Sequence, residues 1–216
     1  GLDYDTVKAI NPNVIYCTIS GFGPTGPYSD RPVLDPVIQG LTGVISRQLN
    51  PEVPFPDLVR NLYADKSSAL TAAQAITAAL LVRERTGQGQ HVEIPMLDAT
   101  MYFFWPDGMM DQTVIDDDAS PGFLLSSVYS LTDCADGKIV YFVTSDPMRQ
   151  ALYDALGHPE WKEDERFATM MAIANPENFQ ALGVLLAEAF AALTVEQALD
   201  ALIANDVPCG PILSAE

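Results

Sequence analysis

The residue whose type and position best suit chemistry is Asp65. It follows the apolar run 62–64 and precedes a long alanine-rich stretch that favours helix. The first N–H groups of a helix have no partner inside the helix, and the helix dipole favours a negative charge there. A carboxylate in this place stays ionised and fixed in orientation, as a nucleophile requires. An ordinary helix N-cap occupies the same place, and spacing alone favours the N-cap interpretation.

Other residue types offer less. The sequence contains no GxSxG nucleophile elbow, no P-loop and no HExxH pair. His91 falls in a strand-like segment and His158 in a Gly-His-Pro-Glu turn, so we interpret both as structural rather than as general bases. No CxxC occurs, and we therefore expect no metal site, but free thiols in a reducing cytoplasm, at Cys17, Cys134 and Cys209.

Hydrophobic patterning predicts an α/β arrangement for the first half of the chain. A β-rich run at 14–19 leads into a loop rich in glycine and proline at 20–27, and loops at strand ends are where ligands bind in α/β folds. The Gly21-Phe22-Gly23 segment of that loop is a weak signal by itself. The other expected elements are helices at 35–45, at 65–86 and from 96 towards 110, and a strand at 90–94. In the helix at 65–86 the leucines recur at the helical spacing of a buried face, and alanines on the remaining turns allow close packing.

The second half predicts a separate unit. An acidic, polar segment is typical of a linker, so we expect units at 1–105 and 121–216 joined by the linker 106–120. Two β-rich runs, 127–131 and 138–143, flank an Asp-Gly hairpin signal. Ser145 is expected to cap one later helix, and Thr194 to open another with a capping box.

Charge and hydropathy exclude several partners. The formal net charge is −18, whereas nucleic acids and anionic membrane surfaces need basic patches. The longest apolar run, 72–82, is shorter than the roughly 20 residues of a membrane-spanning helix, and no signal peptide is apparent. We therefore expect a soluble, cytoplasmic protein that binds neither nucleic acid nor membrane.

Several segments together resemble the family III CoA-transferases of the CaiB/BaiF type, which include formyl-CoA and carnitine CoA-transferases. The matching segments are YCTISGFGPTGPYSDRP (16–32), DPVIQGLTG (35–43), the long stretch 64–99 that begins ADKSSAL, GHPEW (157–161) and VPCGP (207–211). The resemblance implies part of a Rossmann-like large domain at 1–105, which binds CoA and carries catalysis, followed by a smaller, incomplete α+β domain at 121–216.

The resemblance also implies an activity and a site. The family's catalytic aspartate opens its alanine-rich helix, where Asp65 stands here. Transfer of CoA from an acyl-CoA donor to a carboxylic acid acceptor would pass through an aspartyl anhydride and an aspartyl-CoA thioester, with helix-start amides stabilising the oxyanion. CoA enters as a substrate, and a homodimer is expected. Cofactor contacts in the family fall on positions that match Pro32, Val33, Leu34, Asp35 and Met96.

Some positions depart from the family's pattern, and others lie too far from Asp65 to contact a CoA bound there. Pro32 stands where some relatives carry a basic residue, which argues against a polar CoA contact there. Arg83 and Arg85 lie about 20 residues along the helix, roughly 25–30 Å from Asp65, so we interpret them as structural. The segment 120–125 matches a glycine-rich loop of relatives but has one glycine, which argues against formyl or oxalyl specificity.

Two alternatives remain open. An α-methylacyl-CoA racemase shares the fold and the aspartate, but its proton-shuttling histidine matches Leu34, which cannot carry a proton. The other is a truncated, non-catalytic CoA-transferase-like chain. Family members are about twice as long, so we expect this chain alone to turn over CoA esters poorly and to associate through an exposed apolar patch. The acyl donor and acceptor stay unassigned.

Overall fold

The computed structural model describes residues 1–48, 53, 56–116 and 125–214, which form two compact units, Gly1–Tyr129 and Ser130–Glu216. The division falls later than the predicted start of the second unit at 121. Part of the predicted linker, 117–124, lies outside the described residues. Segments on either side of it belong to the first unit because Arg47 Nε donates to Gly108 O (2.7 Å), Arg47 pairs with Asp111, and Ser126 Oγ donates to Arg47 O.

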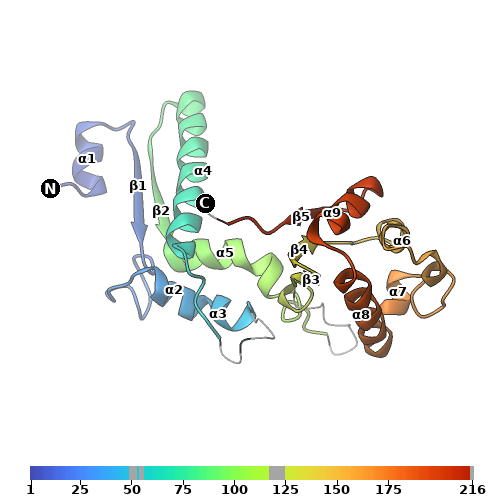
Figure 1. Ribbon diagram of the computed structural model, residues 1–216. Helices are drawn as coiled ribbons and strands as arrows, with labels where there is room; N and C mark the ends of the chain where they lie inside the picture. The colour runs from blue at the N-terminus through green and yellow to red at the C-terminus, as the bar shows by residue number, and fades with distance from the viewer. Residues whose placement is uncertain (49–52, 54–55, 117–124, 215–216) are drawn as a thin grey trace. The chain divides into compact units, whose positions relative to one another are not determined.

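The first unit is built around two parallel strands (Figure 1). Strand β1 pairs with β2 in a register that runs from Ile15 opposite Gln90 to Ser20 opposite Pro95. Its elements are α1 (Tyr4–Ile10), β1 (Ile15–Ser20), α2 (Asp35–Thr42), α3 (Val44–Arg47), α4 (Tyr63–Thr86), β2 (Gln90–Pro95), α5 (Met96–Gly108) and the 3₁₀ turn η1 (Leu125–Ser127).

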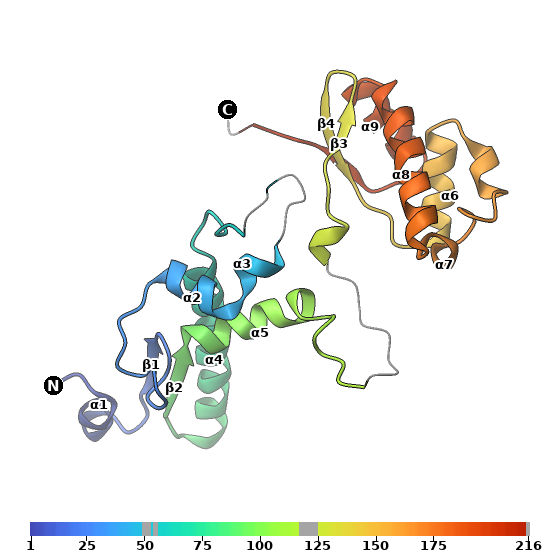
Figure 2. The same cartoon turned by 90° about the horizontal axis from the view of Figure 1, so that it is seen from below.

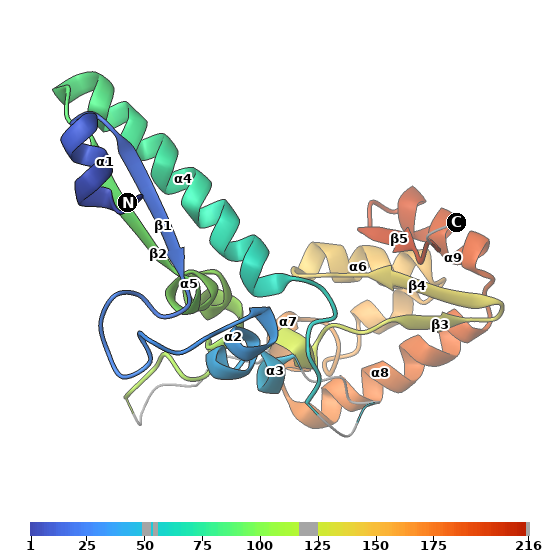
Figure 3. The ribbon, with the colours of Figure 1, turned by 90° about the vertical axis from the view of Figure 1, so that its left-hand side faces the viewer.

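Helix α4 lies along both strands and joins β2 through a tight connection (Figure 3). Gly87 ends the helix with φ 71°, a left-handed conformation that favours glycine. Gly89 approaches the other strand so closely that a Cβ there would lie 2.2 Å from Val14 O, and Gln90 N donates to the same oxygen (3.0 Å). Glycine at position 89 is therefore needed for the two strands to start side by side.

The buried face of α4 is made of small side chains, contrary to the prediction that its leucines are buried. Leu70 is 62% exposed, and Leu80 and Leu81 are also exposed. Ser67 Oγ lies 3.2 Å from Thr100 Oγ1 of α5, a contact that only short side chains permit. The buried residues of α4 are Ala64, Ser67, Ser68, Ala72 and Ala79. Close packing on the strands and on α5 thus selects alanine and serine, which a hydrophobicity pattern overlooks.

The second unit combines an antiparallel sheet of order β3-β4-β5 with helices that pack against it (Figure 2). The predicted strand at 127–131 is wrong: 125–127 form a 3₁₀ turn, and the hairpin turns at 135–136, one residue before the predicted Asp-Gly pair. The elements are β3 (Thr132–Cys134), β4 (Gly137–Tyr141), α6 (Asp146–Ala155), η2 (Pro159–Lys162), α7 (Met170–Ile173), α8 (Pro176–Ala191), α9 (Val195–Ala204) and β5 (Cys209–Pro211).

Local capping signals in this unit are confirmed. Ser145 Oγ accepts from Met148 N at the start of α6. Thr194 and Gln197 form the complete capping box of α9, with each side chain bonded to the other residue's backbone N–H. Because these contacts join residues three apart, the sequence is sufficient to predict them.

One buried cation stands out in the second unit. Arg149 is 1% exposed, and its guanidinium donates to Phe167 O (3.1 Å), Ala168 O (3.0 Å) and Asp146 Oδ1 (2.8 Å). Tyr153 Oη donates to Phe167 O as well. Helix α6 thereby fixes the segment that leads into α7, while burial raises the pKa of Tyr153 to about 12, so that its hydroxyl stays protonated.

Within the described residues, no single helix combines the length and apolar character needed to cross a membrane, although α8 and α9, bent by 115°, satisfy both conditions as a pair.

Candidate functional site

Three predicted parts of the site meet at the carboxyl ends of the parallel strands. Beyond Ser20, at the end of β1, the chain enters the glycine- and proline-containing loop, and beyond Pro95 it enters α5. Because α4 runs into the start of β2 through residues 87–89, its own start lies at the opposite, carboxyl end of the strands (Figure 3). Ligands of open α/β sheets bind at this edge.

Asp65 is the third residue of α4, and its side chain is exposed. Among the described residues, its carboxylate has no hydrogen-bond or ion-pair partner. The N-cap residue is Leu62, which makes no side-chain cap hydrogen bond. The interpretation of Asp65 as an ordinary N-cap is therefore wrong, since the helix begins two residues earlier and, among the described residues, the Asp65 carboxylate accepts no backbone hydrogen bond.

The cap of α4 comes from a distant residue, Asp35, at the start of α2. Asp35 Oδ2 accepts from Ala64 N (2.7 Å) and from Asp65 N (3.0 Å), although the latter is 30 residues away in sequence. Asp35 is 4% exposed. Tyr63 N donates to Asn61 O (2.8 Å), so the first-turn amides that we expected to stabilise an oxyanion are already bonded.

A second buried residue of α2, Gln39, holds Asp35 in place. Gln39 Nε2 donates to Asp35 Oδ1 (2.5 Å) and lies 3.2 Å from both Val59 O and Asn61 O. Gln39 Oε1 accepts from Val59 N (2.9 Å), and the side chain is 1% exposed. The residue thus joins α2 to the segment that enters α4. Sequence reasoning missed it because, apart from Asp35 four positions earlier, its partners Val59 and Asn61 lie 20 or more positions away.

The other predicted cofactor positions lie at the same edge but differ in exposure. Leu34 is 75% exposed, and Pro32 is exposed too. Val33 packs over Gly21, where a Cβ would lie 2.1 Å from Val33 Cγ1. Met96, the first residue of α5, is half-buried. Asp35 differs from the rest because its carboxylate is bonded inside the protein.

The loop after β1 has the spacing G-x-G-x-x-G at 21–26, but it is not a dinucleotide-binding turn. In that motif the last glycine packs the start of a helix, and the phosphate rests on the helix N-terminus. Here the next helix begins only at Asp35. The loop is instead tied back to the strand edge, because Leu97 N donates to Gly21 O (3.1 Å).

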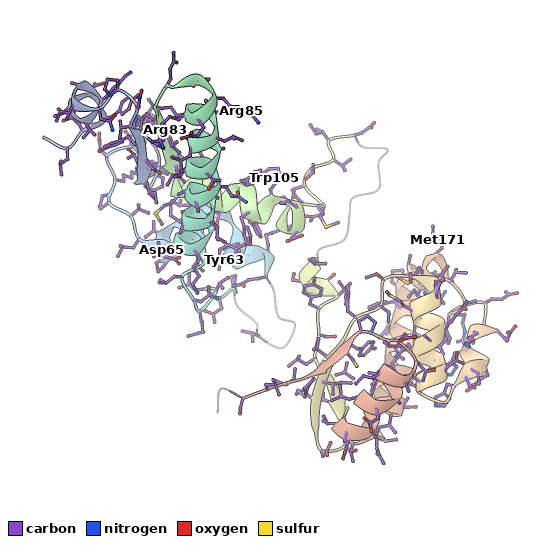
Figure 4. The ribbon with its side chains drawn as sticks, turned by 90° about the horizontal axis from the view of Figure 1, so that it is seen from above. Tyr63, Asp65, Arg83, Arg85, Trp105 and Met171 are labelled. Carbon is purple, nitrogen blue, oxygen red and sulfur yellow. The ribbon has the colours of Figure 1, made fainter. Side chains whose placement is uncertain are left out.

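The two arginines of α4 lie at the end of the helix opposite Asp65 and Tyr63 (Figure 4). Arg83 contacts Asn13 O and is adjacent to Glu84 (3.9 Å). Tyr63 packs edge-on against Phe103 with ring centroids 5.7 Å apart. Burial, and then the charge of Asp107, raise the pKa of the Tyr63 hydroxyl, so it is a neutral donor beside the site.

Among the described residues, no group of three or more His, Cys, Asp and Glu is arranged to hold a metal ion. The three cysteines are free and half-buried, and burial raises the thiol pKa of both Cys134 and Cys209. The described site therefore offers the exposed carboxylate of Asp65 on a backbone held by Asp35, at an edge suited to a ligand.

Comparison with known proteins gives consistent matches. The family model described as CoA-transferase family III matches residues 1–216. A succinate–glutarate CoA-transferase of Agrobacterium fabrum is 30% identical over 230 residues, which cover 100% of this chain and 54% of the relative. An acetyl-CoA:oxalate CoA-transferase of Acetobacter aceti is 29% identical, and the match covers 99% of this chain and 55% of the relative.

Solved structures agree in fold. A CaiB/BaiF family protein from Brucella suis matches with a TM-score of 0.74 and 33% identity, covering 99% of this chain and 56% of that one. The protein Rv3272 from M. tuberculosis matches with a TM-score of 0.83 and 28% identity, covering 100% and 56%. The chain therefore spans about half the length of the relatives it matches.

Proposed function

Because this chain belongs to CoA-transferase family III, we propose that the protein transfers CoA from an acyl-CoA to a carboxylic acid, with Asp65 as the nucleophile. The observation that carries the proposal is the exposed carboxylate of Asp65 at the carboxyl edge of the strands, which has no partner in the described part of the chain. The proposed contacts with CoA come from Pro32, Val33, Leu34, Asp35 and Met96; that of Asp35 would be through its backbone, since its carboxylate is engaged.

The proposed reaction uses one carboxylate in two covalent steps. Asp65 attacks the thioester carbonyl carbon, the C–S bond breaks, and CoA thiolate leaves behind an acyl-aspartyl anhydride. The thiolate then attacks the aspartyl carbonyl of the anhydride and releases the donor as a free carboxylate. The resulting aspartyl-CoA thioester reacts with the acceptor carboxylate in the same two steps reversed, which restores Asp65.

Donors for the oxyanion must come from elsewhere than the first turn of α4, whose amides are bonded to Asp35 and Asn61. The remainder of a Rossmann-like large domain, a small acyl-covering domain, a homodimer and a cytoplasmic location stay predictions.

The direct test is to trap the covalent intermediate. After incubation of the full-length protein with an acyl-CoA panel, mass spectrometry of the peptide that contains Asp65 should show the mass of CoA joined through a thioester. Hydroxylamine should remove the adduct, because it cleaves thioesters. A chain that forms no adduct with any donor, yet binds CoA in a titration, would be the non-catalytic alternative.

The racemase alternative predicts a different outcome. Leu34 stands at the position of the racemase histidine, and an aliphatic side chain cannot shuttle a proton. Incubation of a 2-methylacyl-CoA with the protein in deuterated water should therefore leave the α-carbon unlabelled above the uncatalysed background. Steady deuterium incorporation that grows with enzyme concentration would reverse the choice of transferase over racemase.

A further inference from the structure

We propose that Gln39 is a positioning residue for Asp65, acting through Asp35 and through the segment 59–61. This inference rests on the proposed transferase function. Gln39 lies on the buried side of α2 and is 1% exposed, so we assign it no contact with substrate. Its effect on the reaction would pass through two sets of hydrogen bonds. One set leads through Asp35 to the first turn of α4, and the other leads to the segment that enters α4.

The first set involves the carboxylate of Asp35. Both of its oxygens accept hydrogen bonds: Oδ1 from Gln39 Nε2, and Oδ2 from the backbone N–H groups of Ala64 and Asp65. An ionised carboxylate can accept on both oxygens at once, whereas a neutral amide cannot. The side chain therefore transmits the position of Gln39 to the backbone of Asp65.

The second set involves the segment that enters α4. Gln39 binds both the N–H and the C=O of Val59, and also approaches Asn61 O. This set of partners fixes the orientation of the Gln39 amide. A rotated amide would place its oxygen against the carbonyls of Val59 and Asn61, and its NH₂ group against Val59 N.

The backbone must position Asp65 because its side chain has no partner in the described part of the chain. A nucleophile that is misplaced by about 1 Å can lose on the order of 10²-fold in rate, even when the change lies away from the reacting atoms. We call the hydrogen bonds from Gln39 to Asp35, and from the amides of Ala64 and Asp65 to Asp35, the clamp. Loss of the clamp should lower the rate of the covalent step rather than the binding of acyl-CoA.

Two substitutions break the clamp in different ways. Gln39→Met keeps the length of the side chain but removes its donors and its acceptor. Asp35→Asn keeps the shape but supplies one oxygen and one NH₂ group, so either Gln39 or the amides of Ala64 and Asp65 must face a second donor. A matched control is Ser68→Ala, which removes a buried hydrogen bond to Ala64 O (2.7 Å) in the same turn of α4 but leaves the amides capped.

The experiment measures kcat and KM for an acyl-CoA donor, together with amide hydrogen exchange over the start of α4, in the full-length protein. We expect kcat to fall about 10- to 100-fold in Gln39→Met and Asp35→Asn, with KM changed less than about threefold. Ser68→Ala should keep kcat within about twofold, even if its melting temperature falls. The amides of 64–65 should exchange slowly in the wild-type protein and faster in both clamp variants.

The possible results of this experiment distinguish the positioning role of Gln39 from the proposed transferase function. If Asp65→Asn is inactive but the clamp variants retain wild-type kcat, or lose no more than Ser68→Ala, the positioning role is wrong and the function stands. If Asp65→Asn retains transfer, the proposed function fails first. Rapid exchange of the 64–65 amides in the wild-type protein would also overturn the clamp, and this measurement does not depend on the folding of any variant.

Discussion

Replacement of Asp65 by Asn should abolish CoA transfer while leaving the protein folded. An amide cannot form the anhydride or the thioester, so no residual transfer through this residue is expected. The side chain is exposed and unpartnered in the described residues, and the helix cap is supplied by Asp35. Loss of one charge from the first turn should therefore change the free energy of unfolding by no more than about 1 kcal/mol.

The measurement pairs a transferase assay with a thermal melt. Asp98 provides a matched control because it is also an exposed carboxylate at the third position of a helix, α5. Asp98→Asn should keep wild-type transfer and a similar melt. Full activity in Asp65→Asn would show that this carboxylate is not the nucleophile, whereas equal loss in both variants would indicate a general effect of charge at helix starts.

Replacement of Arg149 by Ala should unfold the second unit at a much lower temperature. The substitution removes a side chain that is 1% exposed and leaves Phe167 O and Ala168 O without this donor. A buried cavity and the loss of these hydrogen bonds together cost about 2–4 kcal/mol, although Phe167 O still accepts from Tyr153 Oη. For a unit of this size, that free energy corresponds to a decrease of about 10 °C or more in melting temperature.

Two further variants separate packing from hydrogen bonding in this unit. Arg149→Met restores much of the volume but none of the donors, so its melting temperature should lie between those of the wild type and Arg149→Ala. Arg166→Ala removes an exposed arginine that pairs with Asp164 and lies over the Phe167 ring (4.6 Å), and it should lower the melting temperature far less than Arg149→Ala. If Arg149→Ala melts like Arg166→Ala, the buried guanidinium contributes little to this unit.

Features that depend on neighbours in sequence could be predicted, and features that depend on distant residues could not. Caps at Ser145 and Thr194 are confirmed because each cap and its partner lie within one helical turn. The cap of α4 is not predicted by the sequence, because Asp35 supplies it from 30 positions away. No local pattern distinguishes a carboxylate that caps its own helix from one whose amide is capped by another segment.

The buried face of α4 and the unit boundary follow the same principle. The hydrophobicity of the α4 leucines predicts that they are buried. The strands and α5, however, approach α4 so closely that only alanine and serine fit between them. The acidic segment predicts a linker, but Arg47 holds residues on both sides of it to the first unit. In both cases a tertiary contact decides the outcome, and composition does not encode its partner.

The family resemblance predicts positions for the candidate site that periodicity and spacing alone do not. Resemblance nominated Asp65 and the stretch that includes Leu34, and the structure brings both to the carboxyl edge of the strands. The sequence alone does not predict that Asp35 caps α4 or that Gln39 binds Asp35, and only the three-dimensional structure shows both contacts. Both residues are buried polar side chains, and only their hydrogen bonds reveal what they hold.

The long-range cap of α4 also has a consequence for the order of folding. Closing a chain segment of 30 residues carries an entropic cost that a local cap avoids. Helix α4 can propagate from its alanine-rich middle, whereas its first turn is completed only when α2 docks and brings Asp35 to the amides. The proposed nucleophile is thus fixed only once α2 has docked, and chains in which α2 is undocked present Asp65 on an uncapped helix end.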